Sequence, residues 1–315
     1  MCLASLAFDV HRRFPLVVAA NRDEYFARPA GRLAWWTPAE GGPQILSGRD
    51  QQAGGLWMGL TAEGRFGLVT NVRQPGVPDP DAPSRGLIVQ RWLKGDMPAH
   101  RFWPHIALTG YQPFNLIAAD FRQGDCFWAT SERASPERIE RGIVGLSNGA
   151  LDSPWPKVDA LKERLHDALD MADSADTLAS MLFAALADRT VAPDEALPST
   201  GVSREVERML SAAFIRSPDQ RYGTRCSTVL VAERVGKRLV THMFERTFTP
   251  GPGLALLRRS TLKDWPPKYL PADAAELHVP TEVGPVSDAE LADAPAVSAP
   301  PKRRVRSLLR PADKL

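Results

Sequence analysis

The amino-acid sequence predicts an α+β fold with antiparallel sheets. Pairs of short apolar segments joined by brief polar turns occur toward both ends of the chain, and amphipathic helical segments are concentrated between them. The composition, 43% hydrophobic and 24% charged, is typical of a globular protein with a buried core. Because strands and helices are not interleaved as in repeating βαβ units, the pattern favours antiparallel pairing over a parallel sheet.

Four hairpins are expected. In each, two apolar segments flank a short polar or Gly-containing connection, which is the sequence signature of antiparallel neighbours. The pairs are residues 3–10 with 14–20, 56–61 with 66–71, 114–120 with 126–130, and 226–233 with 238–248.

Helices are expected between these hairpins. The first would be capped by Ser84, run to Lys94 and stop at Gly95. The other three carry apolar residues at intervals of three and four, as one buried helix face requires. They cover residues 155–171, 177–187 and 203–213.

The chain changes character near Trp265. Residues 266–315 contain nine prolines, few aromatic residues and a cluster of basic residues at the end. Such a segment buries too little apolar surface to offset the entropy of ordering. We therefore predict one domain over residues 1–265 and a disordered, basic-ended tail over 266–315. The tail is interpreted as solvated, with a weak contact to anionic lipid or nucleic acid as the alternative.

Several classes of protein are disfavoured. The 39 basic and 37 acidic residues leave a net charge of +2, so bulk charge gives no reason to expect nucleic-acid binding. No apolar run approaches the roughly 18 residues of a transmembrane helix, and the N-terminus lacks the basic region of a secretory signal. The three cysteines have no CxxC spacing, which disfavours a zinc site and fits a reducing compartment. We expect a cytoplasmic protein without a bound metal.

Cys2 is the residue best placed for nucleophilic chemistry. Removal of Met1 would leave a thiol nucleophile and an α-amino group on one residue. Such an amine has an ordinary pKa of roughly 7.7–8.0, so it can accept the thiol proton near neutral pH. Taken alone, a cysteine after Met1 is more often a small buried thiol.

Further polar candidates lie at the ends of expected strands. Asn21, Arg22 and Asp23 follow residues 14–20, and Arg49 lies in a second polar set, Ser-Gly-Arg-Asp, that ends another apolar segment. Such groups meet where a cleft would open. Arg22 and Asp23 also fit a surface ion pair, which would contribute little.

Three more candidates complete this set. Asn71 ends the strand 66–71, Asn148 precedes Gly149, and Arg225 leads into the strand 226–233. Side-chain amides can donate to a developing oxyanion, as an acyl-transfer site requires. Asn148 equally fits a turn residue.

Seven segments together resemble one protein family. MC at the N-terminus, AANRDEYFARP, SGRD, GGLWMG, TNVR, LSNGALDSPWPKV and YGTRCSTV occur in order from residue 1 to about residue 231. They are similar to the NRDE family, also called the transport and Golgi organisation 2 family. The resemblance implies an N-terminal-nucleophile (Ntn) hydrolase-like fold, a four-layer αββα sandwich with two antiparallel sheets.

The N-terminal half more remotely resembles the cysteine Ntn amidases of the penicillin V acylase and bile-salt hydrolase group. By that resemblance Cys2 matches the nucleophile and Asp23 the acid that contacts the terminal amine. Asn71 and Asn148 match the oxyanion and amine-binding asparagines, and Arg225 matches an arginine near the nucleophile.

One position departs from the amidase pattern. Those amidases carry an arginine just before the Asn-x-Asp segment, where this chain has Ala20. Arg22 or Arg49 would have to take its place, and with Asn21 they are candidates for substrate binding. We also expect Cys2, Asp23 and Asn148 to share a cleft with Arg225, whose charge would lower the pKa of the Cys2 thiol.

Two functions follow from the resemblance. The first is an N-terminal-cysteine amidohydrolase that cleaves a linear C–N bond of an acyl substrate, without a cofactor. The second is a non-catalytic carrier of haem or another amphipathic, acyl-CoA-like or lipid-like ligand, since eukaryotic relatives are associated with lipid metabolism and haem mobilisation. The six scattered histidines provide no obvious haem ligand. In both cases the partner is a small molecule.

Overall fold

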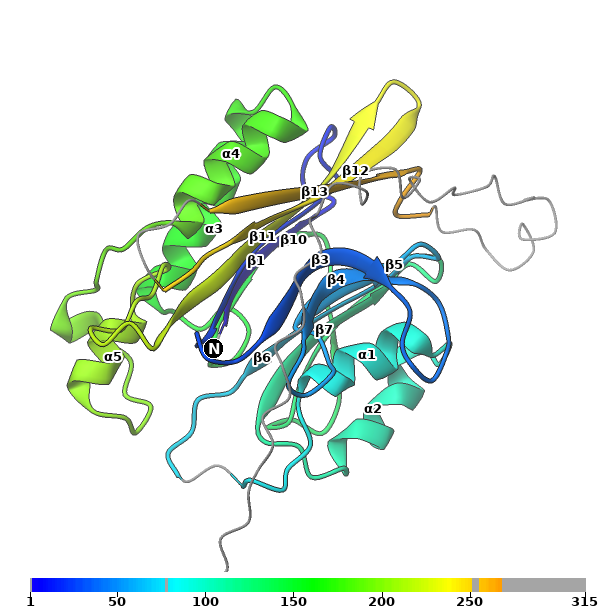
Figure 1. The fold of residues 1–315 in the computed structure, drawn as a ribbon. Helices are drawn as coiled ribbons and strands as arrows, with labels where there is room; N and C mark the ends of the chain where they lie inside the picture. Colours follow the sequence, from blue (N-terminus) through cyan, green and yellow to red (C-terminus); the bar gives the residue numbers. More distant parts are fainter. Residues whose placement is uncertain (1, 77–78, 251–254, 268–315) are drawn as a thin grey trace, which may run out of the picture. The chain divides into compact units, whose positions relative to one another are not determined.

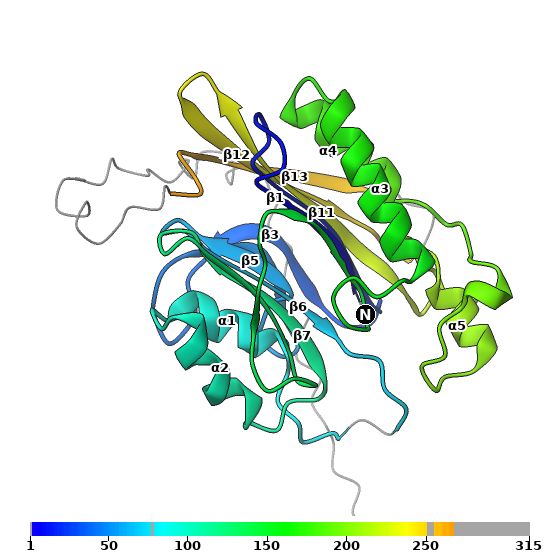
Figure 2. The same cartoon turned by 180° about the vertical axis from the view of Figure 1, so that it is seen from behind.

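Two antiparallel β-sheets lie face to face between two pairs of helices (Figures 1 and 2). The computed structural model describes residues 2–76, 79–250 and 255–267. Within this part of the chain the layer order is helix, sheet, sheet, helix. The predicted α+β class and the four-layer arrangement are thereby confirmed.

The first sheet contains both ends of the described chain. Its six strands run in the spatial order β10-β1-β2-β11-β12-β13. Their bounds are β1 Cys2–Phe8, β2 Leu16–Tyr25, β10 Gly142–Leu146, β11 Tyr222–Val235, β12 Arg238–Thr247 and β13 Leu256–Lys263. Every pairing is antiparallel, so β1 and β2 are interior strands with partners on both sides.

The second sheet is a meander, in which each strand pairs with the next strand along the chain. Its strands are β3 Ala30–Trp36, β4 Ile45–Asp50, β5 Met58–Thr61, β6 Arg65–Asn71, β7 Phe114–Asp120, β8 Asp125–Thr130 and β9 Glu137–Arg138. Short connections join most of these neighbours, which is why the sequence identified two of the hairpins, whereas residues 72–113 between β6 and β7 contain two helices.

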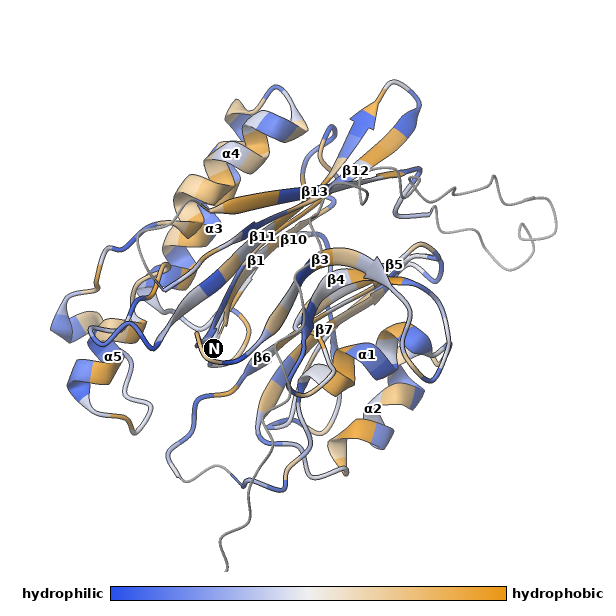
Figure 3. Ribbon diagram, viewed as in Figure 1, coloured by the Kyte–Doolittle hydropathy of each residue, from blue (hydrophilic) through white to orange (hydrophobic). Residues whose placement is uncertain are grey.

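Each sheet is covered by its own helices. α1 (Gly86–Lys94) and α2 (Ala99–Ala107) pack on the second sheet, and α3 (Pro156–Met171) and α4 (Ala175–Leu186) pack on the first. The short helices η1 (Asp194–Ala196) and α5 (Arg204–Leu210) follow α4. Much of α4 is hydrophobic in Figure 3, because it buries seven of its twelve residues.

The helix ends confirm part of the expected capping. Gly95 is the C-cap of α1, and Ser203 caps α5 by accepting from the backbone N–H of Val206. The expected cap at Ser84 is wrong, since Arg85 occupies the N-cap position and makes no side-chain cap bond.

Three apolar clusters separate the layers. Alternation along β1 sends Ala4 and Leu6 toward the second sheet, where they join Leu60 and Phe66. Leu3 on the opposite face of β1 packs with α3 and α4. A third cluster lies between the second sheet and α1 and α2. A residue's parity along β1 and β2 therefore decides whether it faces the other sheet or the helices.

Two polar segments that were expected to follow strands lie within strands instead. β2 continues through Asn21, Arg22 and Asp23 to Tyr25, because β1 and β11 pair with it on both sides. The Ser-Gly-Arg-Asp segment likewise belongs to β4. The expectation that these polar residues follow strand ends is wrong.

Trp265 packs on the body of the protein. Its side chain is buried, its Nε1–H donates to the Thr61 carbonyl at 2.9 Å, and its ring meets Phe121 edge-on at 5.5 Å. Apart from residues 266 and 267, the predicted tail lies outside the described residues. The domain boundary and the disorder of the tail stay predictions.

Two glycines of β10 provide a test of the packing between the first sheet and α3. A Cβ at Gly145 would lie 2.5 Å from Cγ1 of Val158, whereas a Cβ at Gly142 would meet nothing within 4 Å. We expect Gly145→Ala to lower the free energy of unfolding by about 1–3 kcal/mol through overpacking. Gly142→Ala should change it by less than about 0.5 kcal/mol. Equal urea midpoints for the two variants would contradict this account of the α3 interface.

Candidate functional site

Cys2 begins an interior strand and faces the second sheet. It pairs with Arg22 across β1 and β2, and it shares the inward face with Ala4. Its carbonyl accepts a hydrogen bond from the Ser147 hydroxyl at 3.0 Å. Residue 2 is therefore held by both neighbouring segments of the first sheet, close to where β1 approaches β6.

Asp23 is buried on the opposite face of β2, on the side of α3. One carboxylate oxygen accepts a hydrogen bond from the Thr224 hydroxyl at 2.7 Å. Burial raises the pKa of Asp23 above its ordinary value, and the nearby charges of Lys157 and Arg22 oppose that rise. Because Asp23 lies on the helix face and the Cys2 thiol on the inner face, the carboxylate is placed near the backbone of residue 2 rather than beside the sulfur.

Lys157, in the first turn of α3, is a buried cation that sequence reasoning missed. Its ammonium group donates to the Leu210 carbonyl at 2.8 Å. Burial lowers the pKa of Lys157 to about 8, while the negative charge of Asp23 works in the opposite direction. A lysine in an amphipathic helix normally indicates a solvent-facing position, so the sequence contained no signal for this role.

A buried ion pair lies beside Lys157. Arg73 contacts Glu207 at 2.6 Å, and its guanidinium lies over the Trp155 ring at 5.1 Å. Both charged side chains are almost fully buried. The charges of Arg73 and Glu207 also act on Lys157, so two acids and two bases form one buried group behind Cys2.

The segment after β10 joins the two sheets near Cys2. Asn148 is buried and donates one amide hydrogen to the Asn71 carbonyl at 2.9 Å. Thr70 donates to the Ser147 carbonyl at 2.6 Å, and Asn115 donates to the Gly149 carbonyl at 2.8 Å. Asn148 is thus fixed by the second sheet, and no residue in the described part of the chain accepts its other amide hydrogen.

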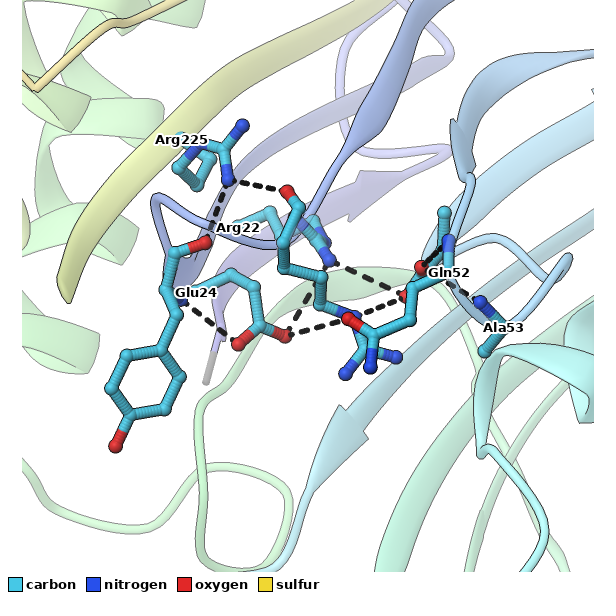
Figure 4. A network of polar contacts seen from close by, with 8 residues as sticks. Arg22, Glu24, Gln52, Ala53 and Arg225 are labelled. Carbon is cyan, nitrogen blue, oxygen red and sulfur yellow. Dashed lines mark hydrogen bonds and ion pairs between the residues drawn. The ribbon is translucent and has the colours of Figure 1, made fainter. Parts of the chain in front are cut away.

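The positive charge of Arg22 acts on Cys2 and lowers the pKa of its thiol. Its guanidinium lies 4.7 Å from the Trp57 ring centre and 3.5–3.6 Å from the carboxylates of Glu24 and Asp50 (Figure 4). Gly48 makes room for this arrangement, because a Cβ there would lie 2.3 Å from the Trp57 ring. Nη1 of Arg22 is buried and has no hydrogen-bond partner within the described part of the chain.

Arg225 points elsewhere. The register of β2 and β11 shifts between Thr224 and Cys226, so Arg225 is the extra residue of a β-bulge. Figure 4 shows its guanidinium directed at two backbone carbonyls, those of Tyr25 at 2.7 Å and Arg28 at 2.8 Å. The role of Arg225 near the nucleophile stays a prediction.

The expectation of a lowered thiol pKa is wrong. Burial raises the pKa of Cys2, and the charges of Asp23 and Glu24 add to that rise, while Arg22 acts against it. Burial also raises the pKa of Cys126, to about 12. The positive charge of Arg22 lowers the pKa of Cys2 but does not outweigh desolvation.

Two candidates for substrate binding have side chains that face away from the space between the sheets, where the Cys2 thiol lies. Alternation along β4 places Arg49 on the face opposite Asp50, and its guanidinium lies 4.6 Å from the Trp36 ring. The amide of Asn21 donates to the carbonyls of Leu186 and Ala213, both at 2.8 Å. Both contacts serve packing, and a role of Asn21 or Arg49 in substrate binding stays a prediction.

Neither a metal cluster nor a membrane-spanning helix is found among the described residues. No three His, Cys, Asp or Glu side chains there come together in a way that could hold a metal ion. None of the described helices combines the length and the apolar character that a bilayer crossing requires.

The low pKa of Lys157 predicts how stability depends on pH. The ordinary pKa is 10.5 and the folded value is about 8, so between these values the unfolded chain binds the extra proton. The free energy of unfolding should therefore rise with pH across this window, and Lys157→Met should abolish that contribution. Urea titrations of both proteins at pH 7.5, 9 and 10 measure the difference. If the free energy of unfolding changed equally with pH in the two proteins, the burial of Lys157 would be contradicted.

Comparisons with known proteins agree on one family. The model of the family Transport and Golgi organisation 2 matches residues 1–250. The Transport and Golgi organization protein 2 homolog of Bos taurus is 32% identical over 254 residues, which cover 75% of this chain and 90% of that protein. Transport and Golgi organization protein 2 of Drosophila melanogaster is 26% identical over 275 residues, 79% of this chain and 93% of that protein.

Among solved structures, the similarity is low. An N-acylethanolamine-hydrolyzing acid amidase ortholog of Caenorhabditis elegans has a TM-score of 0.43 and 11% identity, covering 73% of this chain and 92% of that one. A conjugated bile acid hydrolase from Clostridium perfringens has a TM-score of 0.41 and 8% identity, covering 83% and 96%. The family model and the curated relatives, by contrast, span most of the sequence, and the chain belongs to the Transport and Golgi organisation 2 family.

Proposed function

We propose that this chain is an N-terminal-cysteine amidohydrolase that cleaves a linear C–N bond of an acyl substrate. The observation that supports this most directly is the position of Cys2. It begins an interior strand, and Asp23 and Asn148 come to the same end of the first sheet from distant parts of the sequence. A thiol with only a packing role would not require this set of buried polar neighbours.

The reaction would run through an acyl-enzyme. Once Met1 is removed, the α-amine of Cys2 accepts the thiol proton while sulfur attacks the amide carbonyl carbon. The C–N bond then breaks, and the proton passes from the amine to the leaving nitrogen. Water attacks the resulting thioester and gives a proton to the α-amine, and the C–S bond breaks as sulfur regains a proton. The products are a carboxylic acid and an amine.

The neighbouring residues have distinct roles in this proposal. Asp23 would hold the protonated α-amine, and Lys157 would offset the burial of the Asp23 carboxylate. The second amide hydrogen of Asn148, which no described residue accepts, would donate to the oxyanion. Asn71 pairs with Phe114 on the face toward α1 and α2, so its part in this site would be the backbone carbonyl that fixes Asn148. Arg22 would supply the positive charge that the related amidases carry two residues earlier, at the position of Ala20.

The raised thiol pKa is compatible with this mechanism. A buried thiol that stays protonated at neutral pH must lose its proton during the attack, and an amine on the same residue is positioned to receive it. The nucleophile would therefore be activated within the reaction step and would not exist as a free thiolate beforehand.

The effect of Arg22 on the thiol provides the first test. Arg22→Gln removes a charge that lowers the pKa of Cys2, so the pH midpoint of iodoacetamide alkylation at Cys2 should rise by about 1 unit. Arg225→Gln is the matched control, because its guanidinium binds the carbonyls of Tyr25 and Arg28. Because these midpoints lie above the ordinary thiol value of 9.0, peptide mass spectrometry across pH 7–11 measures both. A larger shift of the alkylation midpoint in Arg225→Gln than in Arg22→Gln would mean that Arg225, and not Arg22, supplies the charge that acts on the thiol.

The second test addresses catalysis itself. The intact mass should correspond to a chain without Met1, and Cys2→Ser should reduce hydrolysis of a panel of acyl amides to background. Cys126→Ala, at a buried thiol in β8, should leave turnover intact as long as the variant is folded. Retention of Met1, or full turnover by Cys2→Ser, would rule the mechanism out. If the mechanism were ruled out in this way, a saturable change in haem absorbance on mixing with the protein would favour the non-catalytic carrier function.

A further inference from the structure

A hollow lined by arginines lies at the end of the first sheet remote from Cys2. It has a volume of about 400 Å³ and is lined by Asp9, Val10, His11, Arg12, Arg141 and Arg234. Antiparallel register brings these residues together, because Phe8 at the end of β1 pairs with Leu16 of β2 and with Gly142 of β10. We call it the arginine pocket.

The arginine pocket has an excess of positive charge. Arg12, Arg141 and Arg234 form no ion pair with any carboxylate in the described part of the chain. The acids nearest in sequence are already engaged, since Glu233 pairs with Arg13 at 2.6 Å and Glu140 lies 3.5 Å from Arg138. Asp9 is the sole acid of the lining, which leaves a formal charge of +2.

Backbone contacts hold the lining in place. The N–H of Arg234 donates to the Arg13 carbonyl at 2.7 Å, and its Nε donates to the Arg12 carbonyl at 3.2 Å. His11 stacks on the buried ring of Phe14 and accepts from the Phe14 N–H through Nδ1. Because Nδ1 is engaged as an acceptor, Nε2 is the ring nitrogen of His11 that can donate to a bound molecule.

We propose that the arginine pocket binds the phosphate group of a phosphorylated molecule. Each guanidinium group can donate two parallel hydrogen bonds to the oxygens of a phosphate. Three arginines and one histidine provide more donors than the two oxygens of a carboxylate can accept, so a phosphate is the better match. The volume is within the range of small-molecule sites and leaves room for the organic part of a phosphate ester.

The arginine pocket is separate from the site proposed for hydrolysis. Cys2 and Phe8 are the two ends of β1, so about 20 Å of extended strand separates Cys2 from the arginine pocket. Failure of the amidohydrolase proposal would leave this one unaffected. The phosphate could belong to a soluble ester or to a phospholipid headgroup, and the experiment distinguishes the two.

Calorimetric titration of the full chain with inorganic phosphate in 150 mM NaCl tests the proposal. Arg12 and Arg141 are exposed and make no side-chain hydrogen bond within the described residues, so Arg12→Gln/Arg141→Gln should keep the melting temperature and weaken binding at least about tenfold. Arg101→Gln, at an exposed arginine of α2 outside the pocket, is the matched control and should bind as the unmodified chain does. Absence of phosphate binding, or equal affinity of the double variant, would overturn the proposal.

A sedimentation assay identifies the source of the phosphate. Phosphatidylcholine vesicles with and without phosphatidic acid are mixed with the unmodified chain and with the double variant. Binding only to the phosphatidic acid vesicles, lost in the double variant, supports a lipid headgroup. Phosphate binding without vesicle binding supports a soluble ester. Vesicle binding that the double variant retains would contradict a role of the arginine pocket at membranes.

Discussion

The register of β2 between β1 and β11 is the constraint on which the candidate site depends. Pairing of Cys2 with Arg22 places both on the face toward the second sheet, and it leaves Asp23 on the face toward α3. A slip of one residue would exchange these faces and separate the thiol from its arginine. The apolar alternation of β1 and β2 prevents that slip, because it would also move the core residues Ala4, Leu6 and Val18 out of the space between the sheets.

The buried charges behind Cys2 are tolerated because they are balanced. Asp23 is offset by Lys157, and Arg73 is paired with Glu207, so burial of four ionisable groups leaves no net charge. A buried pair contributes little net stability, but removal of one partner leaves an uncompensated charge. Replacement of any one of these four side chains would therefore destabilise the other three. Such mutual dependence keeps the charges in fixed positions, as a site that holds a charged amine requires.

The sequence predicts the local features of this fold better than the long-range ones. The hairpins and the helices α3 and α4 were found because their signals lie within about twenty residues. β13 was missed because it is largely polar and exposed, and α2 because it contains Pro104 and no capping side chain. For the site, the resemblance singled out Cys2, Asp23 and Asn148. The burial of Lys157 and the choice of Arg22 over Arg225 depend on tertiary packing and register, which no local pattern records.

The bulge at Arg225 has a consequence for how β11 tolerates change. Thr224 pairs with Asp23 and Cys226 pairs with Arg22, so consecutive partners on β2 correspond to positions two apart on β11. Residue 225 is thus supernumerary to the ladder, and its deletion would restore a regular strand without altering which side chains face Asp23 or Arg22. Loss of residue 225 therefore keeps the pairing on both sides of the bulge, whereas loss of a residue in the regular part of the ladder, such as Leu230, would reverse the faces of the strand on one side of the gap.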